Sequence, residues 1–257
     1  MTASPLQRTG AAALLIIIVI ASPASPKTIY VDDDSAGANN GSSWTDAYNY
    51  LQDALADANA ATKPVEIRIA AGIYKPDLGN GITPGDRNPS FPLISRVCLM
   101  GGYAGVNAPE ANARDINSYE TILSGDLADD DGPDFANNTE NTYHVLTAFV
   151  TDATAVIDGV TVTAGNANHE EWSRSIGAGM YSYYGGTTIR NCNFIANFAG
   201  NDDGGGQGGA IYNRKSNPTI TDCKFIRNCA IALDGGAGDG GAICNRDSDP
   251  IIDNCDF

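Results

Sequence analysis

Histidine, basic residues and long apolar runs are scarce in this chain of 257 residues. There are two histidines, and no Cys-x-x-Cys pair or His/Cys cluster with zinc spacing occurs, which argues against a structural zinc site. Lys and Arg number 15 against 31 Asp and Glu, and a net charge of −16 argues against a nucleic-acid partner, because phosphates need a basic face. The longest apolar run, residues 11–20, is about half of the roughly 20 residues that cross a bilayer.

Residues 1–24 have the features of a secretory signal peptide. Arg8 precedes the apolar run AAALLIIIVI, which ends at the small residues and prolines of ASPASP. A charged start, a short apolar core and a small-residue exit are typical of a segment that is removed on export, and an uncleaved N-terminal anchor is the alternative. We therefore expect a secreted chain with its domain over 25–257 and no transmembrane segment after cleavage.

The second half of the chain is repetitive. The segments AVIDGVTVTAGNA, TTIRNCNFIANFA, PTITDCKFIRNCA and PIIDNCDF align at steps of 32, 31 and 32 residues. Such a period is the signature of a solenoid, so we expect stacked coils over 145–257. The apolar columns are Ile157/Ile189/Ile220/Ile252, Val160/Cys192/Cys223/Cys255 and Val162/Phe194/Phe225/Phe257.

The local pattern indicates which solenoid this is. Cys192 and Phe194 share a strand face, but the isoleucine three residues before the cysteine has the wrong parity unless the chain bends between them. The intervening column contains only residues that tolerate left-handed backbone angles, namely Gly159, Asn191, Asp222 and Asn254. The sequence therefore predicts a tight corner at this column.

Further columns predict a second corner and another strand in each repeat. The second corner is expected at Gly165, Asn197 and Asn228, and the strand column contains Met180, Ile211 and Ile243. Three short strands per turn define an all-β fold, a right-handed parallel β-helix that forms a three-sheet solenoid. The glycine-rich segments 200–206 and 233–239 are expected as loops at one corner.

Stacking turns each column into a ladder with rungs about 4.8 Å apart. We expect Phe194, Phe225 and Phe257 to form a core ladder rather than an aromatic sugar-binding stripe. The cysteine column is expected to pack as small apolar groups, although neighbours at this spacing are also within disulfide range. Six cysteines in an exported chain allow 15 pairings, and the sequence does not choose among them.

The N-terminal part, about 27–75, is expected to cap the solenoid. Ser43 and Asp46 have the spacing of a capping box, and Leu51 and Leu55 recur at helical spacing, which predicts a helix beginning at Ser43. A helix here would cover the open first coil, which needs a cap for solubility. The alternating segment VEIRIAAGIY is expected to start the coils.

A loop after the predicted strand 121–123 is rich in carboxylates. Asp126, Asp129, Asp131 and Asp134, beside Gly132, are the candidate ligands of a calcium ion, which takes six to eight oxygens. The spacing fails the EF-hand template. A hydrated acidic loop without an ion is the alternative interpretation.

The tetrads GGAI at Gly208 and Gly240, with the units FIAN at Phe194 and FIRN at Phe225, resemble chlamydial-type polymorphic outer-membrane protein repeats. The segments IYVDDDSAGANNGSSWTDAYNYLQDAL and AAGIYKP resemble secreted bacterial β-helix proteins of the pectin-lyase-like superfamily. This resemblance implies an exported, cell-surface β-helix of a group in which adhesion and passenger proteins without assigned catalysis predominate. The earliest tetrad is the degenerate GAGM, and the last repeat stops at Phe257, so we expect a C-terminally truncated solenoid.

Residues rather than fold must decide whether this chain is an enzyme. Asp202 and Asp203 are the best local carboxylate pair, but no GHG motif occurs, and His144 and His169 lie upstream of that pair. Arg214 and Arg246 share a column near Asp247 and Asp249. An exposed basic ladder is one interpretation of this column, but we favour a solvated surface whose opposite charges compensate one another. We therefore assign no catalytic residue.

Taken together, the sequence predicts a scaffold or adhesin-like protein, secreted or on the outer-membrane surface. Its expected partners are extracellular polysaccharide or cell-surface components. The alternatives are a polysaccharide lyase or glycoside hydrolase acting on acidic polysaccharide, and a calcium-stabilised carbohydrate-binding module.

Overall fold

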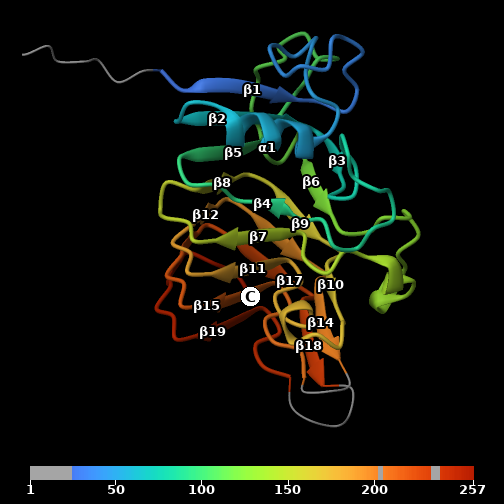
Figure 1. Cartoon of the computed structure of the whole chain (residues 1–257), viewed down its shortest axis with the longest axis vertical. Helices are drawn as coiled ribbons and strands as arrows, with labels where there is room; N and C mark the ends of the chain where they lie inside the picture. Colours follow the sequence, from blue (N-terminus) through green and yellow to red (C-terminus); the bar gives the residue numbers. More distant parts are fainter. Residues whose placement is uncertain (1–24, 202–204, 233–237) are drawn as a thin grey trace, which may run out of the picture.

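The computed structural model describes residues 25–201, 205–232 and 238–257. The expected signal peptide and parts of the two glycine-rich loops, residues 202–204 and 233–237, lie outside these ranges. Within them the chain winds into a parallel β-helix, whose coils stack from β1 at the blue end to β19 at the red end (Figure 1). The predicted all-β parallel β-helix is confirmed by the strand pairings, which join consecutive coils in parallel.

Three long sheets form the sides of the solenoid. The first contains β1 (Lys27–Val31), β2 (Val65–Ala70), β5 (Val97–Tyr103), β8 (Val156–Asp158), β12 (Thr188–Arg190), β16 (Thr219–Thr221) and β20 (Ile251–Asp253). The second contains β3 (Gly72–Tyr74), β6 (Thr121–Ser124), β9 (Thr161–Thr163), β13 (Asn193–Ile195) and β17 (Lys224–Ile226). The third contains β4 (Phe91–Pro92), β7 (Leu146–Phe149), β11 (Met180–Tyr183), β15 (Ile211–Arg214) and β19 (Ile243–Arg246).

A fourth, shorter sheet is present in the repeat coils in addition to the three expected. It pairs β10 (Asn166–Ala167), β14 (Phe198–Asn201) and β18 (Cys229–Ala232). Besides the one α-helix of the described residues, which is treated below, the connections in this part of the chain contain three short 3-10 turns: η1 (Pro133–Phe135), η2 (Asn138–Glu140) and η3 (Trp172–Arg174). Both η1 and η2 lie in the loop between β6 and β7.

The predicted ladders form the core except at their last rung, where Ile252 and Phe257 are 39% and 70% exposed. Ile157, Ile189, Ile220 and Ile252 are register partners on successive coils, as are Met180, Ile211 and Ile243. The ring of Phe225 stacks between those of Phe194 and Phe257, with centroids 5.3 Å and 4.9 Å apart. This order follows from the two-residue strand period, which turns every second side chain inward.

The cysteine ladder consists of free thiols. All six cysteines lie in the described residues and none forms a disulfide. The Sγ atoms of Cys192 and Cys223 donate to the carbonyls of Arg190 and Thr221, each at 3.1 Å. The hydrogen bond with Cys192, together with burial, raises the pKa of the Cys223 thiol, so this thiol stays protonated inside the coil.

The first predicted corner is confirmed, whereas the second is displaced by one residue. Gly159, Asn191, Asp222 and Asn254 have φ between 50° and 76°. At the second corner the left-handed residues are Ala164, Ala196 and Arg227, rather than the expected Gly165, Asn197 and Asn228. The expected residues instead serve the interior, where Asn197 is fully buried and bonds to the backbone of the preceding coil.

The helix prediction was right in its existence and wrong in its start. Helix α1 spans Leu51–Ala60 and follows Tyr50, which has extended backbone angles. Ser43 and Asp46 do bond reciprocally, but they close a turn. Tyr48 then pairs in extended form with Tyr30, so a helix cannot begin at Ser43.

Helix α1 covers the core of the first coils. Its buried residues Leu51, Ala54, Leu55 and Ala58 join the same hydrophobic cluster as Ile29 and Ile67 of β1 and β2. Figure 1 shows the helix lying against these strands at the N-terminal end of the stack. This packing removes the apolar surface of the first coil from water.

Candidate functional site

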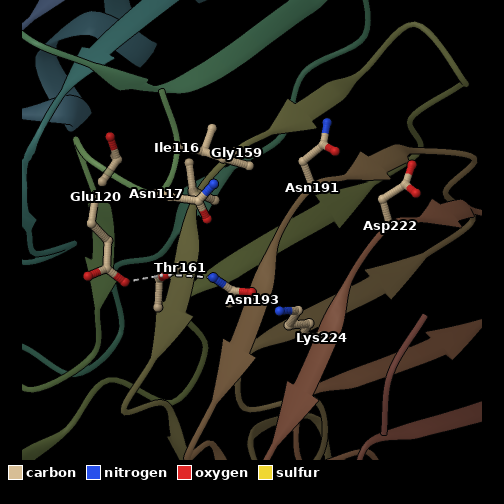
Figure 2. A pocket seen from close by; sticks show the side chains of 11 residues that line it. Ile116, Asn117, Glu120, Gly159, Thr161, Asn191, Asn193, Asp222 and Lys224 are labelled. Carbon is tan, nitrogen blue, oxygen red and sulfur yellow. Dashed lines mark hydrogen bonds between the residues drawn. The ribbon is translucent and has the colours of Figure 1, made fainter. Parts of the chain in front are cut away.

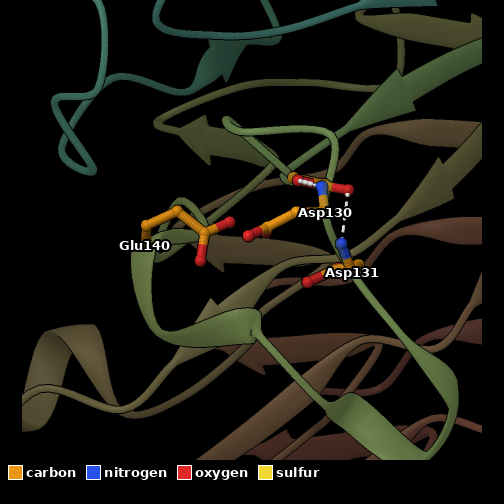
Figure 3. A group of neighbouring side chains, drawn as sticks. Asp130, Asp131 and Glu140 are labelled. Atoms are coloured by element: carbon orange, nitrogen blue, oxygen red, sulfur yellow. Dashed lines mark hydrogen bonds between the residues drawn. The ribbon is translucent and has the colours of Figure 1, made fainter.

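The acidic loop between β6 and β7 brings four carboxylates together. Ligand oxygens of Asp126, Asp130, Asp131 and Glu140 all lie within 4.8 Å of one another. Figure 3 shows Asp130 and Glu140 pointing toward each other from two segments of the loop. We call this group, with the adjacent Asn141, the carboxylate cluster.

Two of the four calcium ligands expected from the sequence lie in the carboxylate cluster, and two lie outside it. Asp126 and Asp131 are members. Asp129 forms an ion pair with Lys75 at 2.5 Å, and Asp134 approaches Arg227 at 3.4 Å. Glu140 was missed because it is the last residue of η2, and the spacing of the carboxylates did not indicate that η1 and η2 return the chain to Asp126.

Hydrogen bonds and burial shape the carboxylate cluster. The Asp126 carboxylate accepts the backbone N–H groups of Asp130 and Asp131, at 3.3 and 3.2 Å. Asn141 Nδ2 donates to Asp131 Oδ2 at 2.8 Å. Burial raises the pKa of Asp131 to about 6, assisted by the negative charges of Asp126, Glu140 and Asp130.

A polar cleft of about 130 Å³ lies on the outer face of the second sheet. Thr161, Asn193 and Lys224 are register partners on β9, β13 and β17 and line this cleft. Glu120, which accepts a hydrogen bond from Thr161 at 2.8 Å, and Asp222 lie at opposite ends of the row in Figure 2. The cleft thus offers two separated carboxylates, amides and one amine.

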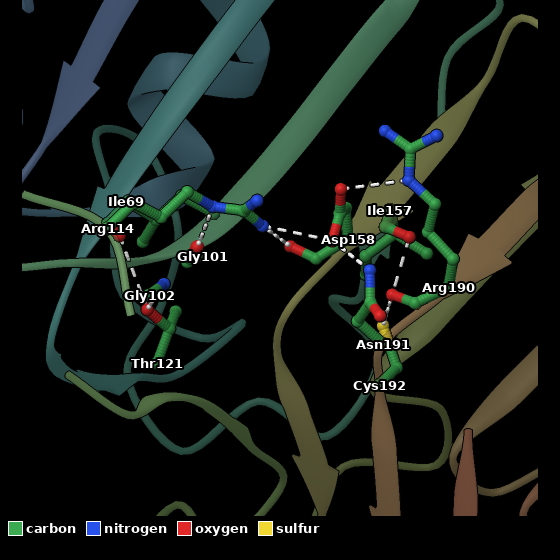
Figure 4. A network of polar contacts seen from close by, with 10 residues as sticks. All are labelled: Ile69, Gly101, Gly102, Arg114, Thr121, Ile157, Asp158, Arg190, Asn191 and Cys192. Atoms are coloured by element: carbon green, nitrogen blue, oxygen red, sulfur yellow. Dashed lines mark hydrogen bonds and ion pairs between the residues drawn. The ribbon is translucent and has the colours of Figure 1, made fainter. Parts of the chain in front are cut away.

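A buried aspartate fixes the wall of this cleft. Asp158 accepts hydrogen bonds from Arg114 (3.0 Å), Arg190 (2.8 Å) and Asn191 (2.9 Å), and Figure 4 shows the two arginines on opposite sides of it. Burial alone would raise the pKa of Asp158, but its three donors outweigh burial and hold that pKa below its usual value. Since Arg114 also donates to Gly101 O, the network holds the loop before β6 against the coil and is structural.

An aromatic and cationic surface lies on the outer face of the third sheet. Phe149, Tyr183, Arg214 and Arg246 are consecutive register partners on β7, β11, β15 and β19. This register confirms the predicted pairing of Arg214 with Arg246. We call the set the aromatic–cationic strip, and it comprises Phe149, Val150, Tyr183, Tyr184, Arg214, Lys215 and Arg246.

Two of the aromatic rings in the strip are well exposed to solvent. Phe149 is 50% and Tyr184 is 47% exposed. The Arg214 guanidinium lies 5.6 Å from the Tyr183 ring centroid, and Lys215 Nζ donates to the Tyr184 hydroxyl at 3.0 Å. The alternation in MYSYY, residues 180–184, was the sequence signal for outward tyrosines here, and it was not used.

The remaining candidates do not form a catalytic group with the cleft. Asp202 and Asp203 lie outside the described residues. Both ring nitrogens of His144 lie 3.0 Å from backbone carbonyls, those of Gly177 and Ser173, and burial lowers the pKa of this imidazole to about 4. Neither His144 nor His169 lines the cleft.

Among the helices of the described residues, none is both long enough and apolar enough to cross a membrane.

Comparison with known proteins yields one solved structure and no family. No protein-family model matches the chain, and no curated protein matches it. A crystal structure of pectin methylesterase in complex with hexasaccharide VII is similar, with a TM-score of 0.43 and 13% identity over 89% of this chain and 67% of that one. The chain's own strand pairings therefore define its class, a parallel β-helix protein.

Proposed function

We propose that this chain is an exported β-helix that binds an extended acidic polysaccharide and serves as an adhesive or scaffolding surface, secreted or displayed on the outer membrane. The observation that carries the proposal is the aromatic–cationic strip. The charged start and short apolar core at 1–24, and the resemblance of the GGAI and Phe-x-x-Asn units to surface-protein repeats, support export.

The spacing of the strip suits a repeating polymer. Its rungs follow the stacked coils and are therefore about 4.8 Å apart, close to the length of one sugar residue in an extended chain. A polysaccharide running along the solenoid axis would meet Phe149 and Tyr183 first and Arg214 and Arg246 next. Aromatic rings can cover the apolar faces of sugars, and exposed groups of this kind mark interaction surfaces.

The charge of the strip favours an acidic ligand. The chain as a whole has a net charge of −16, so most of its surface repels an anionic polymer. The strip instead gathers Arg214, Lys215 and Arg246 in neighbouring positions, with one carboxylate, Asp247, beside Lys215 on the next coil. A guanidinium can pair with a carboxylate through two parallel hydrogen bonds, which favours uronate units over neutral sugars.

Variants of the strip test this proposal. We expect Phe149→Ala and Lys215→Glu each to weaken binding to polygalacturonate about tenfold, a change of roughly 1.4 kcal/mol, by removing a ring face and reversing a charge. Affinity electrophoresis or calorimetry at low and high salt would measure this. Tyr50→Ala and Lys224→Glu are the matched controls, since Tyr50 is an exposed ring elsewhere and Lys224 lies in the cleft.

The outcomes separate the two surfaces. Undiminished binding by both strip variants, or binding lost only in Lys224→Glu, would contradict the strip as the binding surface. A neutral glucan should bind more weakly than polygalacturonate. If the two polymers bound equally well, the charge argument would be wrong.

A catalytic function at the polar cleft is the second candidate. Glu120 and Asp222 are the two carboxylates of the cleft that would divide the acid and base roles, and Lys224 lies between them in Figure 2. Against this, Glu120 is already engaged by Thr161, and Asp222 accepts a hydrogen bond from Asn254. We therefore rank binding above turnover.

A further inference from the structure

We infer that the carboxylate cluster of Asp126, Asp130, Asp131, Glu140 and Asn141 is a calcium site that ties the two ends of the loop between β6 and β7 together. The inference concerns a different part of the molecule from the aromatic–cationic strip and does not depend on it. It also replaces Asp129 and Asp134 of the set expected from the sequence with Asp130, Glu140 and Asn141.

The first argument is the arrangement of charge. Four carboxylates within 4.8 Å repel one another. Among the described residues, no Lys, Arg or His forms an ion pair with any of the four. The nearby Lys75 and Arg227 pair with Asp129 and Asp134, and Arg87 donates to the backbone carbonyl of Asn141, from where its charge acts on Glu140 without pairing with it. A bound cation would neutralise the repulsion that this loop otherwise maintains.

The second argument is independent of the charges and comes from buried oxygens without partners. Asn141 is 1% exposed, and its Oδ1 has no hydrogen-bond donor among the described residues. Nδ2 of the same amide donates to Asp131, which places the Asn141 side chain beside the four carboxylates. Glu140 Oε1 is likewise buried and unpartnered. Buried polar atoms rarely lack a hydrogen-bond partner. An ion coordinated by Asn141 Oδ1 and Glu140 Oε1 would supply one to each.

The donor set selects the ion. All the candidate ligands are carboxylate or amide oxygens, which suit hard cations and not zinc. The ligands come from an irregular loop, and calcium accepts six to eight oxygens in flexible geometry, whereas magnesium demands a near-ideal octahedron. Calcium is therefore the expected ion.

Binding would fix a loop that packs on the solenoid. Asp126 follows β6 and Glu140 precedes β7, so one ion bridges the start and end of the segment. Between them, the Phe135 ring lies 5.3 Å from that of Phe198 on β14. We expect calcium to raise the unfolding temperature, since a ligand that binds only the folded state stabilises it by mass action.

Calorimetry with calcium chloride on the full chain tests the inference, and terbium luminescence provides a second measurement. We expect one ion per chain, with affinity at least tenfold weaker in Asp131→Asn and in Glu140→Gln. Asp129→Asn and Asp134→Asn are the matched controls, since each removes one carboxylate of the same loop outside the cluster, and they should bind normally. Asp130→Asn, at an exposed position, replaces either cluster variant if that variant does not fold.

Three outcomes would overturn the inference. One is no heat and no terbium signal up to millimolar concentrations. Another is equal loss of affinity in the Asp129→Asn and Asp134→Asn controls, which would indicate diffuse attraction to an acidic loop. The third is that magnesium displaces terbium as effectively as calcium does, which would show that the site does not prefer calcium.

Discussion

Asn197 is a polar side chain inside the coil, and each of its side-chain polar atoms has a partner. Oδ1 accepts the N–H of Gly165 at 3.0 Å, and Nδ2 donates to Val162 O at 3.0 Å and to Asn228 Oδ1 at 2.9 Å. This amide therefore links the backbone of one coil to the next, at the residue before β14 begins. An apolar residue of the same size could fill the space but could not make these bonds.

We expect Asn197→Leu to lower the free energy of unfolding by at least about 2 kcal/mol, because two buried backbone groups would each lose a partner. Urea unfolding followed by circular dichroism would measure it. Asn193→Leu makes the same chemical change on the outer face of β13 and should cost much less. Equal losses in the two variants would show that the interior hydrogen bonds are unimportant.

At the scale of elements, the two corners differ in how well their positions can be predicted from the sequence. The first corner was predictable because its column holds only Gly, Asn and Asp, which tolerate left-handed angles. The second was misplaced because Ala164, Ala196 and Arg227 have no turn chemistry of their own. Ala196 and Arg227 each precede an asparagine that bonds to the backbone of the preceding coil, a tertiary effect that local residue types do not reveal.

The aromatic ladder on β13 and β17 is the element most open to test. Phe225 is buried between two stacked rings, so Phe225→Ala should lower the free energy of unfolding by about 3 kcal/mol through lost burial and a cavity. The neighbouring Ile226 is 44% exposed, and Ile226→Ala should change the free energy of unfolding by less than about 1 kcal/mol. Thermal and urea unfolding of both variants would decide the matter. Similar free energies of unfolding for the parent and Phe225→Ala would contradict a stabilising role of the stacked rings.

For the whole molecule, the repeat was enough to predict the parallel β-helix, since ladders follow from period and parity alone. The sites were harder to predict. Spacing found Asp126 and Asp131 but not Glu140 or Asn141, which two 3-10 turns bring back to them. The strip was missed because its rings come from two segments, Phe149 on β7 and Tyr183 with Tyr184 at the end of β11, that only coil stacking places side by side with Arg214.

The central claim is that the whole chain holds an acidic polysaccharide without cutting it. The most direct measurement incubates the purified chain with polygalacturonate, with calcium and with chelator, and records both retained polymer and released products. The account predicts retained polymer and no unsaturated products or new reducing ends in either condition. Product release by the parent chain that is abolished by Glu120→Gln would contradict the claim and assign catalysis to the polar cleft.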